Sequence, residues 1–225
     1  MTDYLVPDKT EWNSDDPRQK LDTFDEEFFR VQYNAWMPRE QPILSDTLAA
    51  LSPVDKIISE RIARKEKRDL MLEVGCGNGR VSISLLVNDA VDELVMIDIS
   101  DEMARNAEET AALHGVKPIV LRSSLESFQW QTLFDIVLAQ ELLEHLFNVH
   151  EGLAKIESLL LPGGIFLGTV PKLHTCDAVV HLHYFTRESL EQLLSGYFDN
   201  VLVSEIDATG QGQIHLLFFA EGRED

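Results

Sequence analysis

The chain has 225 residues, with 19 Lys and Arg against 39 Asp and Glu, which gives a formal net charge of −20. Apolar residues make up 44% and charged residues 26% of the sequence, which is ordinary for a soluble globular protein and argues against wholesale disorder. The acidic balance argues against extended nucleic-acid binding, because phosphates are neutralised by clustered Lys and Arg.

The first 66 residues are predicted to form a helical extension. Aromatic side chains recur at i,i+4 spacing between residues 24 and 36, a pattern typical of a helix with one strongly apolar face. Residues 44–65 predict a second amphipathic helix. Its expected buried positions are Leu48, Leu51, Ile57, Ile58 and Ile62.

Residues 67–225 are predicted to form one domain, in which short apolar runs alternate with helix-like segments. The runs that predict strands are Leu70–Val74, Glu93–Ile97, Pro118–Leu121, Phe134–Ala139, Gly164–Val170, Asn200–Ile206 and Ile214–Ala220. The segments that predict helices are Arg80–Val87, Asp101–Leu113, Glu141–Leu161 and Thr186–Leu194. This alternation predicts an α/β fold with a Rossmann-like, doubly wound sheet of seven strands. Because only residues 207–213 separate the last two strands, we expect an antiparallel hairpin, which gives the sheet an antiparallel final strand.

A glycine-rich loop follows the first strand of this domain and opens its first helix. It reads Glu73-Val74-Gly75-Cys76-Gly77-Asn78-Gly79-Arg80. Glycines permit a tight turn and let a ligand lie against the backbone. A dinucleotide-binding loop would carry its third glycine where this chain has Arg80. The loop therefore predicts a nucleotide or adenosyl site, and a plain glycine turn is the alternative.

An acidic residue ends the next predicted strand. Asp98 lies about 20 residues beyond the glycine loop, where a carboxylate can accept hydrogen bonds from both hydroxyls of a ribose. Ser100 is predicted to cap the following helix, which has two acidic residues in its first turn. The alternative for Asp98 is a solvent-exposed carboxylate at a strand end.

Three ionisable residues follow the fourth predicted strand. At helical spacing, Glu141, Glu144 and His145 share one face, at the carboxyl end of the sheet where ligands bind in such folds. Two carboxylates about 4 Å apart repel each other by about 4 kcal/mol at an effective dielectric constant of about 20. A desolvated face of this kind therefore needs something to offset the repulsion.

Three arrangements would offset it. The first is a divalent cation bound by these three side chains and by His181 or His183, and carboxylates with imidazoles suit Mg²⁺ or Mn²⁺ better than a structural Zn²⁺. The second is a basic partner, such as Arg122 or Arg187. In the third, the helix N-terminus and water accommodate the carboxylates and no metal is bound.

Two segments resemble a known family. The glycine loop with its preceding acid resembles motif I of class I S-adenosylmethionine-dependent methyltransferases, and Phe134–Leu146 resembles motif IV of the ubiquinone-biosynthesis O-methyltransferases and the wider type 11 and type 23 group. The fold-wide resemblance runs from Leu70 to Ala220. It implies an S-adenosylmethionine site formed by Glu73, Gly75, Cys76, Gly77, Gly79, Asp98, Ile99, Met103, Ser124, Leu125 and Gln140.

The resemblance also bears on the N-terminal extension and on the adenine. N-terminal extensions in this family often fold over the donor pocket, so residues 24–36 are expected to form a lid, with core packing as the alternative. Within residues 121–126 serines occupy the place where an acidic or polar residue usually meets the adenine amino group. This departure leaves the adenine contacts open.

Methylation of a hydroxyl oxygen requires a base or a metal, because the pKa of the hydroxyl is far above neutrality. The candidate catalytic residues are His145, His181 and His183, since imidazole titrates near neutral pH. His181 and His183 alternate in sequence, so in an extended segment they would point the same way. A structural role for each histidine is the alternative.

The sequence therefore predicts a cytoplasmic S-adenosylmethionine-dependent methyltransferase that acts on a small molecule at oxygen. Alternatives are a metal-dependent RNA 2′-O-methyltransferase, whose metal site has a similar Glu-x-x-Glu-His pattern, a nicotinamide-dependent dehydrogenase and a non-catalytic adenosyl-binding subunit. The two cysteines make no disulfide framework, and no segment resembles a secretion signal or a membrane span. The oligomeric state is left open, a homodimer included.

Overall fold

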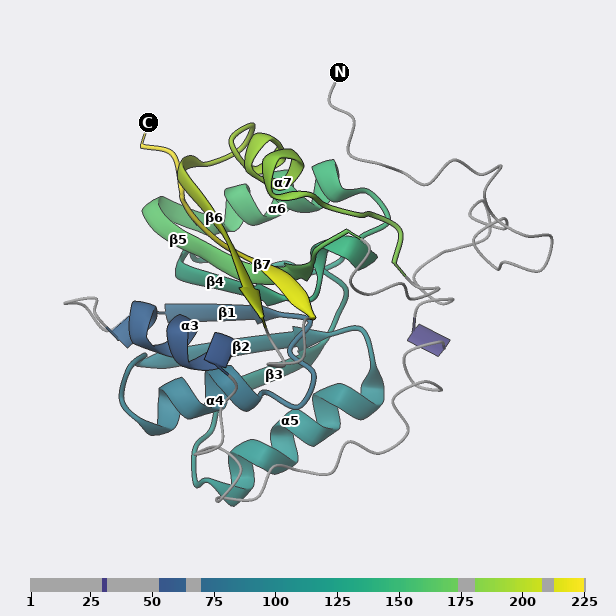
Figure 1. Ribbon diagram of the computed structural model, residues 1–225. Coiled ribbons are helices and arrows are strands. Elements are labelled where there is room, and N and C mark those ends of the chain that lie inside the picture. Colours follow the sequence, from purple (N-terminus) through teal and green to yellow (C-terminus); the bar gives the residue numbers. More distant parts are fainter. Residues whose placement is uncertain (1–29, 32–52, 64–69, 174–180, 208–212, 225) are drawn as a thin grey trace.

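The computed structural model describes residues 30–31, 53–63, 70–173, 181–207 and 213–224. Within these residues seven strands form one sheet in the order β3-β2-β1-β4-β5-β7-β6 (Figure 1). The strands are β1 (Leu70–Val74), β2 (Glu93–Asp98), β3 (Ile119–Arg122), β4 (Phe134–Gln140), β5 (Leu160–Pro171), β6 (Asp199–Asp207) and β7 (Ile214–Glu221). The predicted Rossmann-like α/β fold is confirmed.

Helices cover both faces of the sheet, as the alternating pattern predicts. One face carries α3 (Pro53–Ala63), α4 (Arg80–Val87) and α5 (Asp101–Leu113), and the other carries α6 (Val149–Leu159) and α7 (Arg187–Leu194) (Figure 1). Each face encloses its own cluster of buried apolar side chains. The β1 and β4 strands are buried on both sides, which explains why they read as nearly continuous apolar runs.

The helix starts follow local capping chemistry. Ser100 accepts a hydrogen bond from the Met103 amide at the start of α5, and the first turn of α5 is acidic. Thr186 and Ser189 form a reciprocal capping box at the start of α7. The Ser100 cap lies where the sequence predicts it, and Thr186 begins the predicted segment Thr186–Leu194 as its cap.

The order of the strands in the sheet reverses between β1 and β4: β2 and β3 lie on one side of β1, and β4 and β5 lie on the other. β1 pairs in parallel with β2 on one side and with β4 on the other, so the chain leaves β1 and β4 toward helices on different faces. A crevice opens at the carboxyl ends of the strands at such a point, and ligands bind there. The fold thus brings the loops that follow β1, β2 and β4 to one edge of the sheet.

The last two strands form the predicted antiparallel hairpin. β6 and β7 pair antiparallel, and β7 also pairs antiparallel with β5. The final strand therefore lies between β5 and β6 rather than at the edge of the sheet. This insertion brings the start of β7 to the carboxyl end of β5.

Two helix predictions need correction. The expected helix Glu141–Leu161 is wrong at both ends: a 3₁₀-helix, Leu143–His145, precedes α6, and residues 160–161 already belong to β5. In α3, Ile58 and Ile62 are buried as expected, but Ile57 is 40% exposed. Val54 and Asp55 are buried as well, because the buried face follows the i,i+4 row of Val54, Ile58 and Ile62, and Ile57 lies beside this row.

The N-terminal predictions lie largely outside the described residues. Of the expected lid helix, only residues 30–31 are described, and they are helical. The α3 helix packs into the same buried cluster as α4 and α5. No helix in the described part of the chain combines the length and apolar character that a bilayer crossing requires.

Close packing at the centre of the sheet makes one glycine indispensable. An added Cβ on Gly168 of β5 would lie 1.8 Å from the Ala139 carbonyl oxygen and 2.8 Å from the Phe218 ring. Gly168→Ala is therefore expected to lower the free energy of unfolding by about 3 kcal/mol, because neither neighbour can move freely. Urea unfolding checks this, with Gly196→Ala as the control: its Cβ would lie 3.2 Å from the Leu193 carbonyl oxygen, so a clearly smaller loss is expected. Equal midpoints for the two variants would contradict the packing argument.

Candidate functional site

The glycine loop adopts a conformation that favours glycine at three positions. Gly75, Gly77 and Gly79 have φ angles of 69°, 54° and 73°. A Cβ on Gly79 would lie 2.6 Å from Ile83 Cδ1, so this residue allows α4 to pack closely behind the loop. A Cβ on Gly77 would meet nothing within 4 Å. The middle of the loop is thus open on the side where a ligand would lie.

Asp98 lies directly against this loop. The Gly77 amide donates a hydrogen bond to Asp98 Oδ2 at 2.9 Å, and the Ser100 amide donates to Oδ1 at 2.8 Å. Burial raises the pKa of Asp98, and the backbone hydrogen bonds from Ser100 and Gly77 oppose this by lowering it. The glycine loop and the strand-end carboxylate therefore lie in direct contact, which is the arrangement that a shared site requires.

Glu73 is buried beneath the loop at the end of β1. Its carboxyl group accepts a hydrogen bond from the Ser82 hydroxyl on α4. Burial raises the pKa of Glu73 to about 8, while the Ser82 hydrogen bond and the charge of Arg80 lower it. At neutral pH this side chain is therefore largely protonated, and it ties β1 to α4 behind the loop.

A pH dependence of stability follows from Glu73. Its pKa of about 8 in the folded protein exceeds the ordinary value of 4.5, so between these values the folded protein holds one more proton than the unfolded chain. This contribution to stability is complete below pH 4.5 and is lost as the pH rises through 8. From about pH 6 to 8 it falls by about 2 kcal/mol, and Glu73→Gln is expected to remove this loss.

Urea unfolding of both proteins across this pH range measures the effect. The difference between wild type and Glu73→Gln isolates Glu73, because all other titrating groups are shared. A constant difference across the range would contradict the raised pKa.

The other predicted cofactor residues lie at the same edge of the sheet. Cys76, Met103, Ser124 and Leu125 are buried, and Ile99 and Gln140 are half-buried. The Ser124 hydroxyl accepts a hydrogen bond from the Ser127 amide at 3.2 Å, so it helps to hold its own turn. Gln140 donates a hydrogen bond to Asp55 on α3 at 3.1 Å, a contact that joins two segments far apart in sequence.

The turn after β4 is irregular, and this separates the three ionisable residues predicted to share a helical face. Glu141 has a φ angle of 51°, a left-handed conformation that is uncommon outside glycine and frequent at functional sites. Its carboxylate pairs with His215 Nδ1 on β7 at 2.8 Å. Sequence reasoning missed His215, because its partner is 74 residues away and only the insertion of β7 beside β5 joins them.

Glu144, His145 and His181 form a cluster whose ligand atoms lie close enough together to hold a metal ion. One potential ligand atom from each lies within 4.8 Å of the others. Glu144 is 1% exposed, and neither of its carboxylate oxygens has a hydrogen-bond partner. Burial raises the pKa of Glu144 well above its usual range, and the nearby charge of Glu141 raises it further. A buried carboxyl group without partners is costly, so this group calls for a cation or a proton.

The contacts of this turn bear on the three ways in which the repulsion between its carboxylates could be offset. Arg122, one of the expected basic partners, pairs instead with Asp101 at 2.9 Å, whereas Glu141 has a basic partner that was not predicted, His215. His145 Nε2 lies 3.7 Å from Glu144 Oε1, and the rings of His145 and His181 meet edge to face with centroids 4.9 Å apart. Glu141 does not belong to this three-residue cluster.

His183 is placed differently from His181. Its Nε2 lies 2.7 Å from the Leu146 carbonyl oxygen, so this nitrogen carries a proton and donates to the backbone. Burial lowers the pKa of His183. The two histidines thus meet different partners, and His183 bonds to the end of the 3₁₀-helix.

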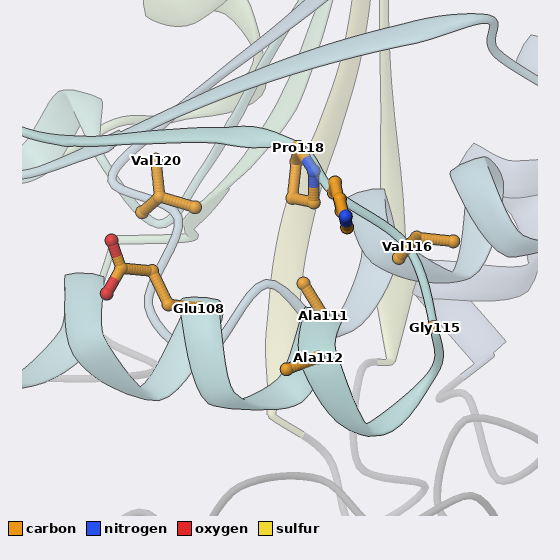
Figure 2. A pocket seen from close by; sticks show the side chains of 8 residues that line it. Glu108, Ala111, Ala112, Gly115, Val116, Pro118 and Val120 are labelled. Atoms are coloured by element: carbon orange, nitrogen blue, oxygen red, sulfur yellow. The ribbon is translucent and has the colours of Figure 1, made fainter.

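A separate hollow of about 370 Å³ lies between α5 and β3 (Figure 2). Its wall combines small apolar side chains with one acidic and one basic residue: Glu108, Ala111, Ala112, Gly115, Val116, Lys117, Pro118 and Val120. It lies at the amino end of β3, whereas the glycine loop lies at the carboxyl ends of the parallel strands. It contains none of the predicted site residues.

Comparisons with known proteins agree with this geometry. Residues 72–166 match the family model described as a methyltransferase domain. The chain is 27% identical over 150 residues to the ubiquinone biosynthesis O-methyltransferase of Rickettsia felis, a match that covers 62% of this chain and 57% of the relative. The matched part of the chain thus spans little more than half the length of this relative.

Solved structures share the fold. The 1,6-didemethyltoxoflavin-N1-methyltransferase of Burkholderia thailandensis aligns with a TM-score of 0.66 and 16% identity, over 99% of this chain and 93% of that one. The [4+2]-cyclase SpnF aligns with a TM-score of 0.70 and 14% identity, over 90% and 98%. At these identities the likeness establishes the fold alone, and the two names show that one fold serves different reactions.

The match of residues 72–166 adds sequence similarity to the fold, and it begins in the strand that leads into the glycine loop. The loop faces Asp98 across a hydrogen bond, at the place where the strand order turns around. Residues 72–166 thus carry the sequence similarity to a methyltransferase domain, and this match together with the shared fold supports the class I S-adenosylmethionine-dependent methyltransferase superfamily.

Proposed function

We propose that the chain is an S-adenosylmethionine-dependent methyltransferase that acts on a small molecule at an oxygen atom. The observation that carries this proposal is the 2.9 Å hydrogen bond between the Gly77 amide and Asp98, which joins an open glycine loop to a carboxylate suited to a ribose. The name of the curated relative, an O-methyltransferase, supports oxygen as the acceptor atom.

The cofactor brings an activated methyl group, so the protein has mainly to align it with the acceptor. Asp98 would exchange the Gly77 amide for ribose hydroxyls, and the half-buried Ile99 that follows it would contact the adenine. Arg30 pairs with Asp101 at the start of α5 at 3.2 Å, which supports a lid function for the helical residues 30–31. In the absence of a bound cation, His145 and His181 are the proposed proton acceptors for a hydroxyl substrate, and with a cation bound they would be its ligands instead.

A divalent cation is part of the proposal. The residues present fit one, because Glu144 is buried without hydrogen-bond partners and its ligand atom converges with those of His145 and His181. Two imidazoles and one carboxylate suit a divalent metal such as Mn²⁺, with Mg²⁺ as the harder alternative. A bound cation would lower the pKa of an acceptor hydroxyl.

Calorimetry with S-adenosylmethionine and S-adenosylhomocysteine tests the central claim. Binding of both in the micromolar range is expected, and no heat at high micromolar concentration would refute the proposal. Fluorescence titration with NADH is expected to show no binding, since the loop lacks the third glycine of a dinucleotide site.

The comparisons do not favour the RNA methyltransferase, the dehydrogenase or the non-catalytic subunit. The net charge of −20 disfavours an RNA substrate. A cytoplasmic location and a homodimer stay predictions. Activity that is indifferent to EDTA and to added Mn²⁺ would remove the metal from the proposal while leaving methyl transfer intact.

A further inference from the structure

A buried aspartate on α3 reaches the cofactor edge of the sheet. Asp55 lies in the first turn of α3 and is 1% exposed, although α3 precedes the first strand of the domain. Its Oδ2 forms an ion pair with Arg80 Nη2 at 2.8 Å, and its Oδ1 accepts a hydrogen bond from Gln140 Nε2 at 3.1 Å. A charged group this deeply buried is costly unless such partners satisfy it.

The two partners belong to the segments that follow β1 and end β4, the two strands between which the strand order reverses. Arg80 is the first residue of α4 and directly follows Gly79, the last glycine of the loop. Gln140 is the last residue of β4 and directly precedes the left-handed Glu141. One carboxylate thus connects the end of the glycine loop to the start of the turn after β4, at the point where the strand order turns around.

The charges of Asp55 and Arg80 also influence the residue that is buried beneath the glycine loop. Arg80 and Asp55 both act on the buried Glu73, Arg80 lowering its pKa and Asp55 raising it. The three ionisable side chains therefore surround the base of the loop from α3, α4 and β1. Removing the Asp55 carboxylate would break its ion pair with Arg80, which is 47% exposed and could then turn toward water. It would also remove the hydrogen-bond acceptor of the Gln140 carboxamide.

We propose that Asp55 is a positioning residue for the cofactor site, which holds the glycine loop and the Gln140 carboxamide in their relative places through Arg80 and Gln140. This inference rests on the proposed function, because it concerns the same S-adenosylmethionine site. It also assigns a function to α3, whose N-terminus then forms part of the wall of the site.

Calorimetry with S-adenosylmethionine on Asp55→Ala, Arg80→Met and the double variant tests this inference. We expect the Kd to rise about tenfold in Asp55→Ala and about threefold in Arg80→Met. We expect the double variant to bind no more weakly than Asp55→Ala, because both changes break the same contact. Glu157→Gln, which breaks the remote ion pair with Arg223, is the matched control and is expected to keep the wild-type Kd.

A second readout separates positioning from stability alone. In the ligand-free Arg80→Met protein, the amide NMR signals of Gly77 and Gly79 are expected to shift, while those of α7 stay in place. Arg80→Met acts from the exposed partner, so it keeps the test open if Asp55→Ala fails to fold. Asp55→Asn, which retains an acceptor for Gln140, is expected to bind with an intermediate Kd.

Three results would overturn the inference. A wild-type Kd in both Asp55→Ala and Arg80→Met, even with lowered unfolding midpoints, would reduce Asp55 to a structural role. Multiplying losses in the double variant would show that the two residues act separately. A wild-type protein that binds no S-adenosylmethionine would refute the proposed function and this inference together, whereas the first two results refute the inference alone.

Discussion

Asp98→Ala is expected to raise the Kd for S-adenosylmethionine by at least about 100-fold. The substitution removes a carboxylate suited to two charge-assisted hydrogen bonds with the ribose, each contributing about 1.5–3 kcal/mol. It also removes the acceptor for the Gly77 and Ser100 amides, so the loop loses its connection to the end of β2. Isothermal titration calorimetry measures the effect directly.

The control for this prediction lies on the same strand. Glu93→Gln changes an exposed acid at the opposite end of β2 and is expected to leave the Kd within about twofold of wild type. Asp98→Asn retains the shape and one acceptor, so an intermediate loss is expected. An Asp98→Ala protein that binds S-adenosylmethionine as tightly as wild type would refute the assignment of the site.

Glu144→Gln is expected to abolish Mn²⁺ binding and to lower methyl transfer by at least about 100-fold, without lowering the stability of the metal-free protein. A buried carboxylate with no hydrogen-bond partner does not stabilise the fold, and the amide has the same shape without the charge. It is a far weaker metal ligand than a carboxylate. Electron paramagnetic resonance with Mn²⁺, together with urea unfolding in EDTA, measures the two effects separately.

The combination of a functional loss with retained stability distinguishes a ligand from a packing residue. Glu188→Gln, an acid in the first turn of α7, serves as the control and is expected to keep both Mn²⁺ binding and activity. A Glu144→Gln protein that is strongly destabilised but still binds Mn²⁺ would assign Glu144 to the core instead. Because the pKa of Glu144 is raised, a bound cation has to displace a proton from its carboxyl group. The affinity for Mn²⁺ is therefore expected to increase with pH.

The local sequence pattern was sufficient to predict the strands and most of the helices. The strand β1 begins and ends at the predicted residues, and Ser100 and Thr186 cap the predicted helices. Each of these features depends on interactions within a few residues, namely alternating burial, side-chain caps and glycine φ angles. The glycine loop and Asp98 were also predictable, because the parallel pairing of β1 and β2 follows from the order of the elements.

The turn after β4 shows where local pattern fails. Helical spacing placed Glu141, Glu144 and His145 on one face, but the left-handed Glu141 and the short 3₁₀-helix direct their side chains to different partners. Tertiary contacts decide this conformation: Glu141 pairs with His215 of β7, and the Glu144 carbonyl accepts the Leu182 amide. Such contacts override weak helix propensity over a stretch this short.

The residues and their order along the chain were enough to predict the superfamily, the glycine loop and its partner carboxylate, since these depend on short-range geometry and on one parallel pairing. The tertiary structure alone decided which distant side chains meet. It placed Asp55 between Arg80 and Gln140, His215 beside Glu141, and His181 beside His145. The reason is physical: contacts between residues far apart in sequence depend on how α3 docks on the sheet and on where β7 inserts, and no local periodicity encodes either.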